Sequence, residues 1–135
     1  LPYRERLDAA IKTSRTTIQD AIGISVADSV LQLDIIKAIV AFTQGGSTAR
    51  RISKFRPKVP ILAVTFTTSV QRKLEAYWGV IPILSKIQNE MTNDDELAST
   101  IAKEKGCVVG DYIIITAGYP TGEGTANMMK IIEVK

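Results

Sequence analysis

The sequence contains no histidine and only one cysteine, Cys107. Histidine is the commonest general base and metal ligand in proteins, so any acid–base or metal site here would lack its usual component. One cysteine cannot form an internal disulfide, which fits a reducing cytosol, and no histidine is available to activate its thiol. No apolar run reaches the roughly 18 residues of a membrane span, and no signal peptide is visible. We therefore expect a cytoplasmic protein without a membrane partner.

The chain also lacks a strong charge of either sign. Its 17 basic and 14 acidic residues give a net charge of +3 and a pI near 9.1, which does not predict a nucleic-acid partner. With 135 residues, of which 45% are hydrophobic and 23% charged, the composition is typical of one globular domain. We expect a single domain over residues 1–135.

Helix-like and strand-like segments alternate along this domain. Residues 1–33 predict a helix broken near Lys12–Ser14, because apolar residues recur on one helical face: Ile11, Ile18, Ile22, Val26, Val30 and Leu33. Further helices are predicted at Ser47–Phe55, Thr68–Tyr77 and Thr92–Lys105. Apolar runs predict strands at Ile35–Phe42, Pro60–Thr65, Val80–Leu84, Asp111–Ala117 and Asn127–Val134.

Continuous apolar strands that alternate with helices predict a mostly parallel sheet covered on both faces. The last strand follows the fourth without a helix, and the segment between them is too short for a usual parallel crossover. The last strand should therefore be antiparallel and lie at an edge. The expected fold class is a three-layer α/β/α domain with a five-stranded mixed sheet.

In such sheets a ligand binds beyond the carboxyl ends of the strands, where the strand order reverses. Thr43–Ser47 follows the first predicted strand and Gly118–Thr125 follows the fourth, so both loops border one crevice if these strands are neighbours. The first loop offers a flexible Gly45–Gly46 backbone, the amino end of a helix, and the hydroxyls of Thr43, Ser47 and Thr48. Such an end favours an anion by about 0.3–2 kcal/mol, and its N–H groups donate to phosphate oxygens. Gly122 and Gly124 would let the second loop close over a ligand.

The same turn, "TQGGSTAR", is equally consistent with an ordinary turn in which Ser47 caps the helix, worth about 1 kcal/mol. It matches neither GxxxxGK[ST], whose lysine meets transferring phosphates, nor GxGxxG, so a dinucleotide site is disfavoured. No paired base and nucleophile is present, so no catalytic residue, metal site or cofactor is predicted.

Two charged clusters also have plain interpretations. The basic residues Arg50, Arg51, Lys54, Arg56 and Lys58 are typical of a solvated helix face, with a phosphate or partner contact as the alternative. The acidic run Asp94–Glu96 suits the first turn of a helix better than a metal site. Tyr77–Trp78 indicates packing, because no other aromatic residues gather with it.

Five segments in order resemble the C-terminal domain of bacterial pyruvate kinases, and together they cover essentially the whole chain. They are "DAIGISVADS" (Asp20–Ser29), "KAIVAFTQGGSTARRISKFRP" (Lys37–Pro57), "ILAVT" (Ile61–Thr65), "WGVIPIL" (Trp78–Leu84) and "GDYIIITAGYPTGEGTANMMKI" (Gly110–Ile131). The resemblance implies a strand order of 3-2-1-4-5, which puts the first and fourth strands side by side.

The resemblance also implies an allosteric module. The loop that holds the effector phosphate would be Thr43, Gln44, Gly45, Gly46, Ser47 and Thr48. The loop that closes over the effector would be Gly118, Tyr119, Thr121, Gly122, Glu123 and Gly124. Relatives that respond to fructose 1,6-bisphosphate can carry basic residues where this chain has Gln44 and Asp94–Glu96, so we expect a monophosphate such as AMP or a sugar monophosphate.

The family's catalytic barrel, with its Mg²⁺ and K⁺ ligands, is not in these residues, so the chain alone is not expected to be an enzyme. The parent would convert phosphoenolpyruvate and ADP to pyruvate and ATP. Expected partners are that catalytic domain and other copies of the chain, through a subunit contact that pairs last strands in a homotetramer. Two alternatives remain open: an assembly module with a vestigial pocket, and a free-standing small α/β enzyme.

Overall fold

The computed structural model describes residues 3–13, 17–43, 45–85, 94–117 and 128–135. Its helices are α1 (Tyr3–Thr13), α2 (Ile18–Gln32), α3 (Ser47–Lys54), α4 (Thr68–Leu74) and α5 (Asp94–Glu104). Its strands are β1 (Ile36–Phe42), β2 (Ile61–Thr65), β3 (Val80–Leu84), β4 (Tyr112–Ala117) and β5 (Met128–Glu133). The predicted alternation of helices and strands is confirmed, with the break in the first helix between Thr13 and Ile18.

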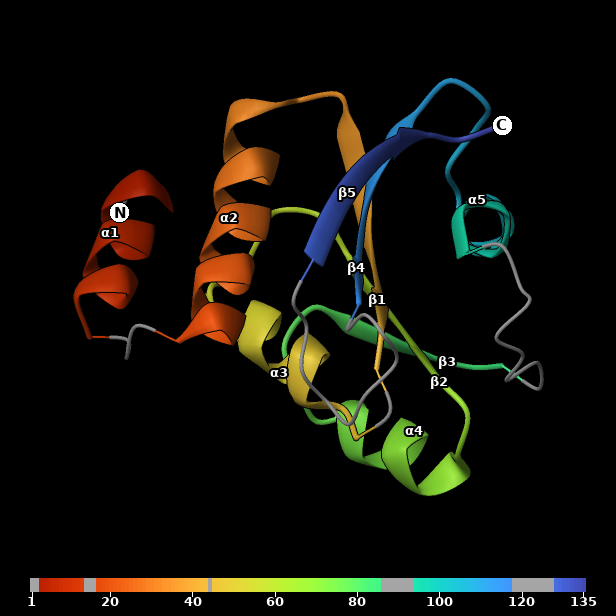
Figure 1. Cartoon of the computed structure of the whole chain (residues 1–135), viewed down its shortest axis with the longest axis horizontal. Coiled ribbons are helices and arrows are strands. Elements are labelled where there is room, and N and C mark those ends of the chain that lie inside the picture. The colour runs from red at the N-terminus through yellow and green to blue at the C-terminus, as the bar shows by residue number, and fades with distance from the viewer. Residues whose placement is uncertain (1–2, 14–16, 44, 86–93, 118–127) are drawn as a thin grey trace.

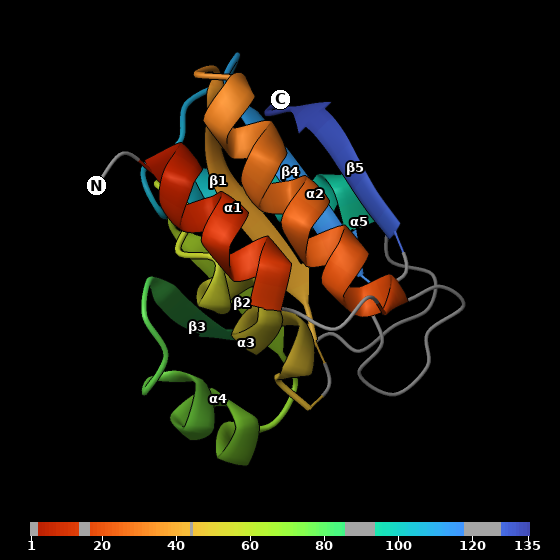
Figure 2. The same cartoon turned by 90° about the vertical axis from the view of Figure 1, so that its left-hand side faces the viewer.

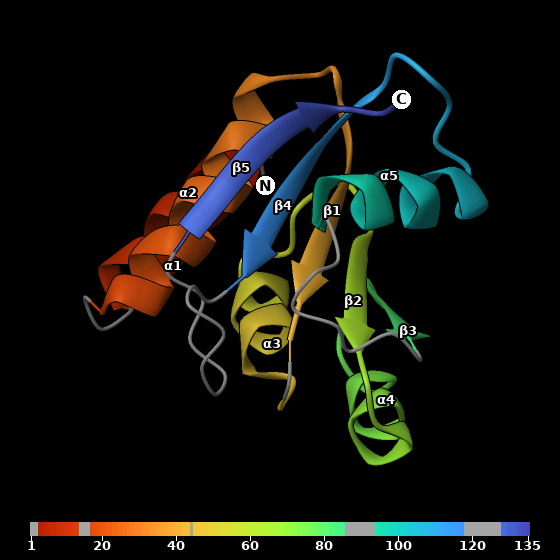
Figure 3. The same ribbon diagram turned by 45° about the vertical axis from the view of Figure 1, so that its right-hand side comes forward.

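The five strands form one mixed sheet in the order β3-β2-β1-β4-β5. The first four strands are parallel, and β5 runs antiparallel to β4 at the edge of the sheet (Figure 3). Both the predicted strand order and the antiparallel last strand are confirmed. β1 and β4 are neighbours, with Ala41 opposite Thr116 near their carboxyl ends.

Helices cover both faces of this sheet, with α1, α2 and α3 on one side and α5 on the other (Figure 1). The faces alternate along β1, as expected for a strand. Ile39 and Ala41 pack with residues of α2, α3 and α4, whereas Ala38 and Val40 pack with residues of α5. The three-layer α/β/α architecture is therefore confirmed.

Some predicted details of the helices are wrong. Ile18 and Leu33 are 66% and 39% exposed, because they lie at the two ends of α2, outside the part that packs on the sheet. Helix α4 ends at Leu74 and not at Tyr77. There the N–H of Tyr77 donates to the Leu74 carbonyl at 3.1 Å, a three-residue spacing that tightens and closes the helix.

Helix α3, which follows the turn after β1, is held firmly at its far end by α1 and α2 (Figure 2). The Tyr3 hydroxyl of α1 donates to the Phe55 carbonyl at 2.6 Å. Gly23 of α2 lies against the Phe55 ring so closely that a Cβ there would come within 3.3 Å of it. Arg51 of α3 pairs with the buried carboxylate of Asp20 at 3.1 Å. These contacts fix the axis of α3 and thereby the direction of its amino end.

Candidate functional site at the carboxyl edge of the sheet

A buried threonine holds the turn after β1 in place. Thr43 is 3% exposed, and its N–H donates to the Val64 carbonyl of β2 at 2.9 Å. Its hydroxyl accepts from the N–H of Gly46 at 2.9 Å. The Thr43 hydroxyl therefore stabilises the turn from its buried side.

Gly46 sets the start of α3. It is the N-cap residue, with φ 91° in the left-handed region, and no described side chain caps this helix end. The left-handed φ favours glycine here, and a Cβ would also make a tight contact, 3.2 Å from Cδ2 of Leu74 in α4. The alternative in which Ser47 is the cap is wrong, because Ser47 is already the first helical residue.

The other residues of the predicted turn differ in their exposure to solvent. Thr48 is 3% exposed, whereas Ser47 is partly exposed and Gly45 is open to solvent. Helix geometry gives the N–H groups of Thr48 and Ala49 no acceptor within α3. A phosphate that approaches from solvent would therefore meet the Gly45–Ser47 backbone and the first turn of α3.

The second predicted loop begins where β4 ends. Because β1 and β4 are adjacent and parallel, Ala117 lies at the same edge of the sheet as Thr43. The predicted loop residues Gly118, Tyr119, Thr121, Gly122, Glu123 and Gly124 lie outside the described residues, as does Gln44.

Two further threonines at this edge were not predicted as site residues. Thr65 ends β2 and Thr116 lies near the end of β4, and both are fully buried on the same face of the sheet as Thr43. The Thr116 hydroxyl donates to the Met128 carbonyl at 3.0 Å. The Thr65 hydroxyl has no partner among the described residues. The sequence signal that could have identified both residues is a threonine at or next to the end of an apolar run.

Each of the two charged clusters contains exposed residues and residues that contact another part of the chain. Arg50, Lys54, Arg56 and Lys58 are exposed, and the guanidinium of Arg56 lies 5.5 Å from the centre of the Trp78 ring. The acidic run is less negative than its sequence suggests. Lys130 of β5 binds both carboxylate oxygens of Asp95, at 2.7 and 2.8 Å. Within the described ranges, no three His, Cys, Asp or Glu side chains gather in one place.

Comparison with known proteins identifies the family. The sequence matches the family described as "Pyruvate kinase, alpha/beta domain" over residues 20–132. The chain belongs to the pyruvate kinase family. It is 47% identical over 133 residues to "Pyruvate kinase" of Staphylococcus haemolyticus and 48% identical over 131 residues to that of Staphylococcus aureus. Each alignment covers 96% of this chain.

The same alignments cover only 22% of each staphylococcal pyruvate kinase. This share agrees with a C-terminal domain of a larger pyruvate kinase, as the sequence predicts.

None of the helices in the described part of the chain is long and apolar enough to cross a bilayer.

Proposed function

We propose that this chain is the regulatory domain of a cytoplasmic pyruvate kinase and binds a phosphorylated small molecule at the turn Thr43–Thr48. The observation that carries the proposal is the adjacency of β1 and β4, which puts Thr43 and Ala117 at one edge of the sheet. A ligand bound there could contact both segments, which is what a phosphate cradle with a closing loop needs.

The geometry of the turn favours an anion for a definite physical reason. A glycine cap leaves the amino end of α3 without the side-chain oxygen that would otherwise accept from its first N–H groups. Those N–H groups and the helix dipole then favour a negative group. Because the turn has no lysine, the phosphate would be held as a signal and not transferred.

The effector we propose is a monophosphate, such as AMP or a sugar monophosphate, in preference to fructose 1,6-bisphosphate. Glu96 is exposed at the amino end of α5, where a second phosphate would meet a negative charge. The ion pair between Asp95 and Lys130 weakens this repulsion. The preference for a monophosphate therefore depends on fewer negative charges than the sequence of the acidic run indicates.

Calorimetric titration of the 135-residue chain with AMP, ribose 5-phosphate and fructose 1,6-bisphosphate tests the proposal. At least one compound should bind saturably, and Ser47→Asp should abolish binding by placing a carboxylate at the phosphate position. Ser25→Asp, on the exposed side of α2, is the matched control and should bind as the wild type does. Binding that survives Ser47→Asp, or no binding of any of the three, would contradict a phosphate site at this turn.

In the full protein the effector would act on the catalytic domain, which converts phosphoenolpyruvate and ADP to pyruvate and ATP.

A second function, subunit assembly, is favoured by β5. In the described part of the chain β5 pairs only with β4, and Ile131 on it is 41% exposed. An unpaired strand edge can join its copy across a two-fold axis. Sedimentation of the chain over a range of concentrations tests this role.

A further inference from the structure

The two outer strands of the sheet differ in what they offer to a strand of another chain. β5 and β3 lie at opposite edges, and within the described ranges β3 pairs only with β2 (Figure 3). The sequence of β3, "VIPIL", has no charged side chain, and Ile81 in it is 38% exposed. β5, in contrast, carries Lys130 and Glu133. Charges on an edge strand discourage pairing with other chains, so β3 would be the edge more prone to such pairing if it had no proline.

The hydrogen bonds between β2 and β3 show which backbone groups of β3 face outward. The Gly79 carbonyl, just before β3, accepts from the N–H of Ile61 at 2.9 Å. The N–H of Ser85, just after β3, donates to the Thr65 carbonyl at 2.8 Å. Because the backbone groups of successive strand residues point to opposite sides, the odd-numbered residues of β3 face β2. The even-numbered residues face the outer side of the sheet: Val80, Pro82 and Leu84.

Pro82 is the middle one of these three outward positions. Proline has no N–H, so the outer side of β3 lacks a hydrogen-bond donor at the centre of the strand. The N–H of Val80 already donates to the Tyr77 carbonyl at 3.3 Å. Of the outward positions in β3, that leaves the N–H of Leu84 for another strand. Because position 82 faces outward, its proline removes no hydrogen bond from the pairing with β2.

We propose that Pro82 closes the β3 edge to strand pairing, so that the sheets of two copies can join only through β5. This inference rests in part on the assembly through β5 proposed above, and it adds where that assembly ends. A sheet with two open edges could pair at both and extend from copy to copy without limit. A sheet with one open edge forms a closed dimer about a two-fold axis.

Two substitutions restore the missing N–H and test the proposal. Pro82→Val keeps a side chain of similar size and Pro82→Ala a smaller one, so an effect common to both comes from the backbone. Both are made in the 135-residue chain together with Ile131→Lys, which places a charge on the exposed part of β5 and opposes pairing there. By sedimentation equilibrium, each should self-associate at least about tenfold more tightly than Ile131→Lys alone. Pro82→Val should leave the midpoint of urea denaturation nearly unchanged.

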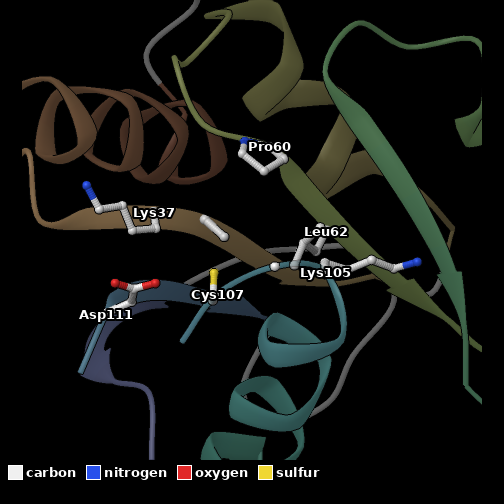
Figure 4. Close-up of a pocket in the computed structure, with 8 residues that line it drawn as sticks. Lys37, Pro60, Leu62, Lys105, Cys107 and Asp111 are labelled. Carbon is white, nitrogen blue, oxygen red and sulfur yellow. The ribbon is translucent and has the colours of Figure 1, made fainter. Parts of the chain in front are cut away.

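Pro60→Val is the matched control in the same Ile131→Lys chain. Pro60 lies at the start of β2 (Figure 4), and its carbonyl accepts from the N–H of Ile39 in β1 at 3.0 Å. The backbone of residue 60 therefore faces β1, inside the sheet. The N–H that Pro60→Val gains cannot reach a second copy, so its association should equal that of Ile131→Lys alone.

With β5 intact, Pro82→Val alone should form species larger than a dimer as its concentration rises, whereas the wild type should stop at a dimer. The proposal is overturned if neither Pro82 variant associates more tightly than Ile131→Lys alone, or if Pro60→Val has the same effect. A wild-type chain that stays monomeric would contradict assembly through β5. It would not contradict the closed β3 edge, because the Pro82 variants are compared with Ile131→Lys alone.

Discussion

At the scale of single residues, the turn after β1 depends on which of its two glycines is replaced. Gly46 has φ 91°, and a Cβ there would meet Leu74. Gly45 does not have a left-handed φ, and a Cβ there would have no described atom within 4 Å. The adjacent glycines look equivalent in the sequence, but only Gly46 is required by the backbone.

Gly46→Ala should therefore lower the free energy of unfolding by about 1–3 kcal/mol and weaken phosphate binding, because the turn must move to relieve the strain. Gly45→Ala is the matched control and should change stability by less than about 1 kcal/mol. Urea denaturation measures both. Equal losses in the two variants would show that the turn does not have the geometry described.

The buried threonines make a second comparison at this scale. Thr65 and Thr116 are both fully buried, but only the Thr116 hydroxyl has a described partner, the Met128 carbonyl. Thr65→Val should raise the free energy of unfolding by about 1–2 kcal/mol, because it removes an unpaired polar group from the core. Thr116→Val should lower it by about 1 kcal/mol. Thermal unfolding of the pair checks the opposite signs, and a loss in Thr65→Val would point to a bonded hydroxyl.

At the scale of elements, α1 is attached to α3 through a titratable contact. The Tyr3 hydroxyl donates to the Phe55 carbonyl, and burial is the main cause that raises the pKa of Tyr3 above its usual value of 10.0. The folded state thus keeps this proton at a pH where the unfolded chain loses it. The contact should stabilise the fold fully below about pH 10 and lose its contribution as the pH rises further.

Tyr3→Phe should cost about 1 kcal/mol at neutral pH, where the hydrogen bond is intact. Above the usual tyrosine pKa the difference between wild type and variant should shrink, because ionised Tyr3 can no longer donate. Denaturation curves for both proteins at neutral and strongly alkaline pH measure this difference, which isolates Tyr3 from other groups that titrate there. A difference that stays constant with pH would contradict the contact.

The elements also show what the sequence can predict. Strands are located to within a residue or so because buried parallel strands are continuous apolar runs, as in β2, where every residue of Ile61–Thr65 is buried. The proposed turn is recognisable because glycines and hydroxyls follow such a run. The position of its cap is not recognisable, since the sequence does not show which of the two glycines takes the left-handed φ and packs against Leu74 of α4.

Contacts between distant segments explain the other misses. The acidic run in the first turn of α5 reads as a negative patch, yet Lys130, on a strand 35 residues further along, pairs with Asp95. The basic cluster reads as a solvated face, yet Arg51 pairs with the buried Asp20 of α2. Local patterns specify elements and their order, whereas these pairs form only once the sheet has brought the elements together.

At the scale of the whole molecule, the carboxyl edge of the sheet and the edge formed by β5 are two different surfaces. The first is proposed for a phosphate, and the second would join copies of the chain. Any coupling of the carboxyl edge to the rest of a pyruvate kinase would have α3 as a rigid connection, since Asp20 and Tyr3 hold its far end.

Assembly through β5 makes the last prediction. Ile131 is exposed on β5, and a two-fold axis along this edge would bring Ile131 close to its copy. Ile131→Lys places like charges at that contact without disturbing the Lys130–Asp95 pair, and should weaken self-association at least about tenfold. Ile35→Lys alters another exposed isoleucine, just before β1, and should associate as the wild type does. Sedimentation equilibrium distinguishes the two, and a wild-type chain that stays monomeric at every concentration would rule out this edge as a sufficient interface.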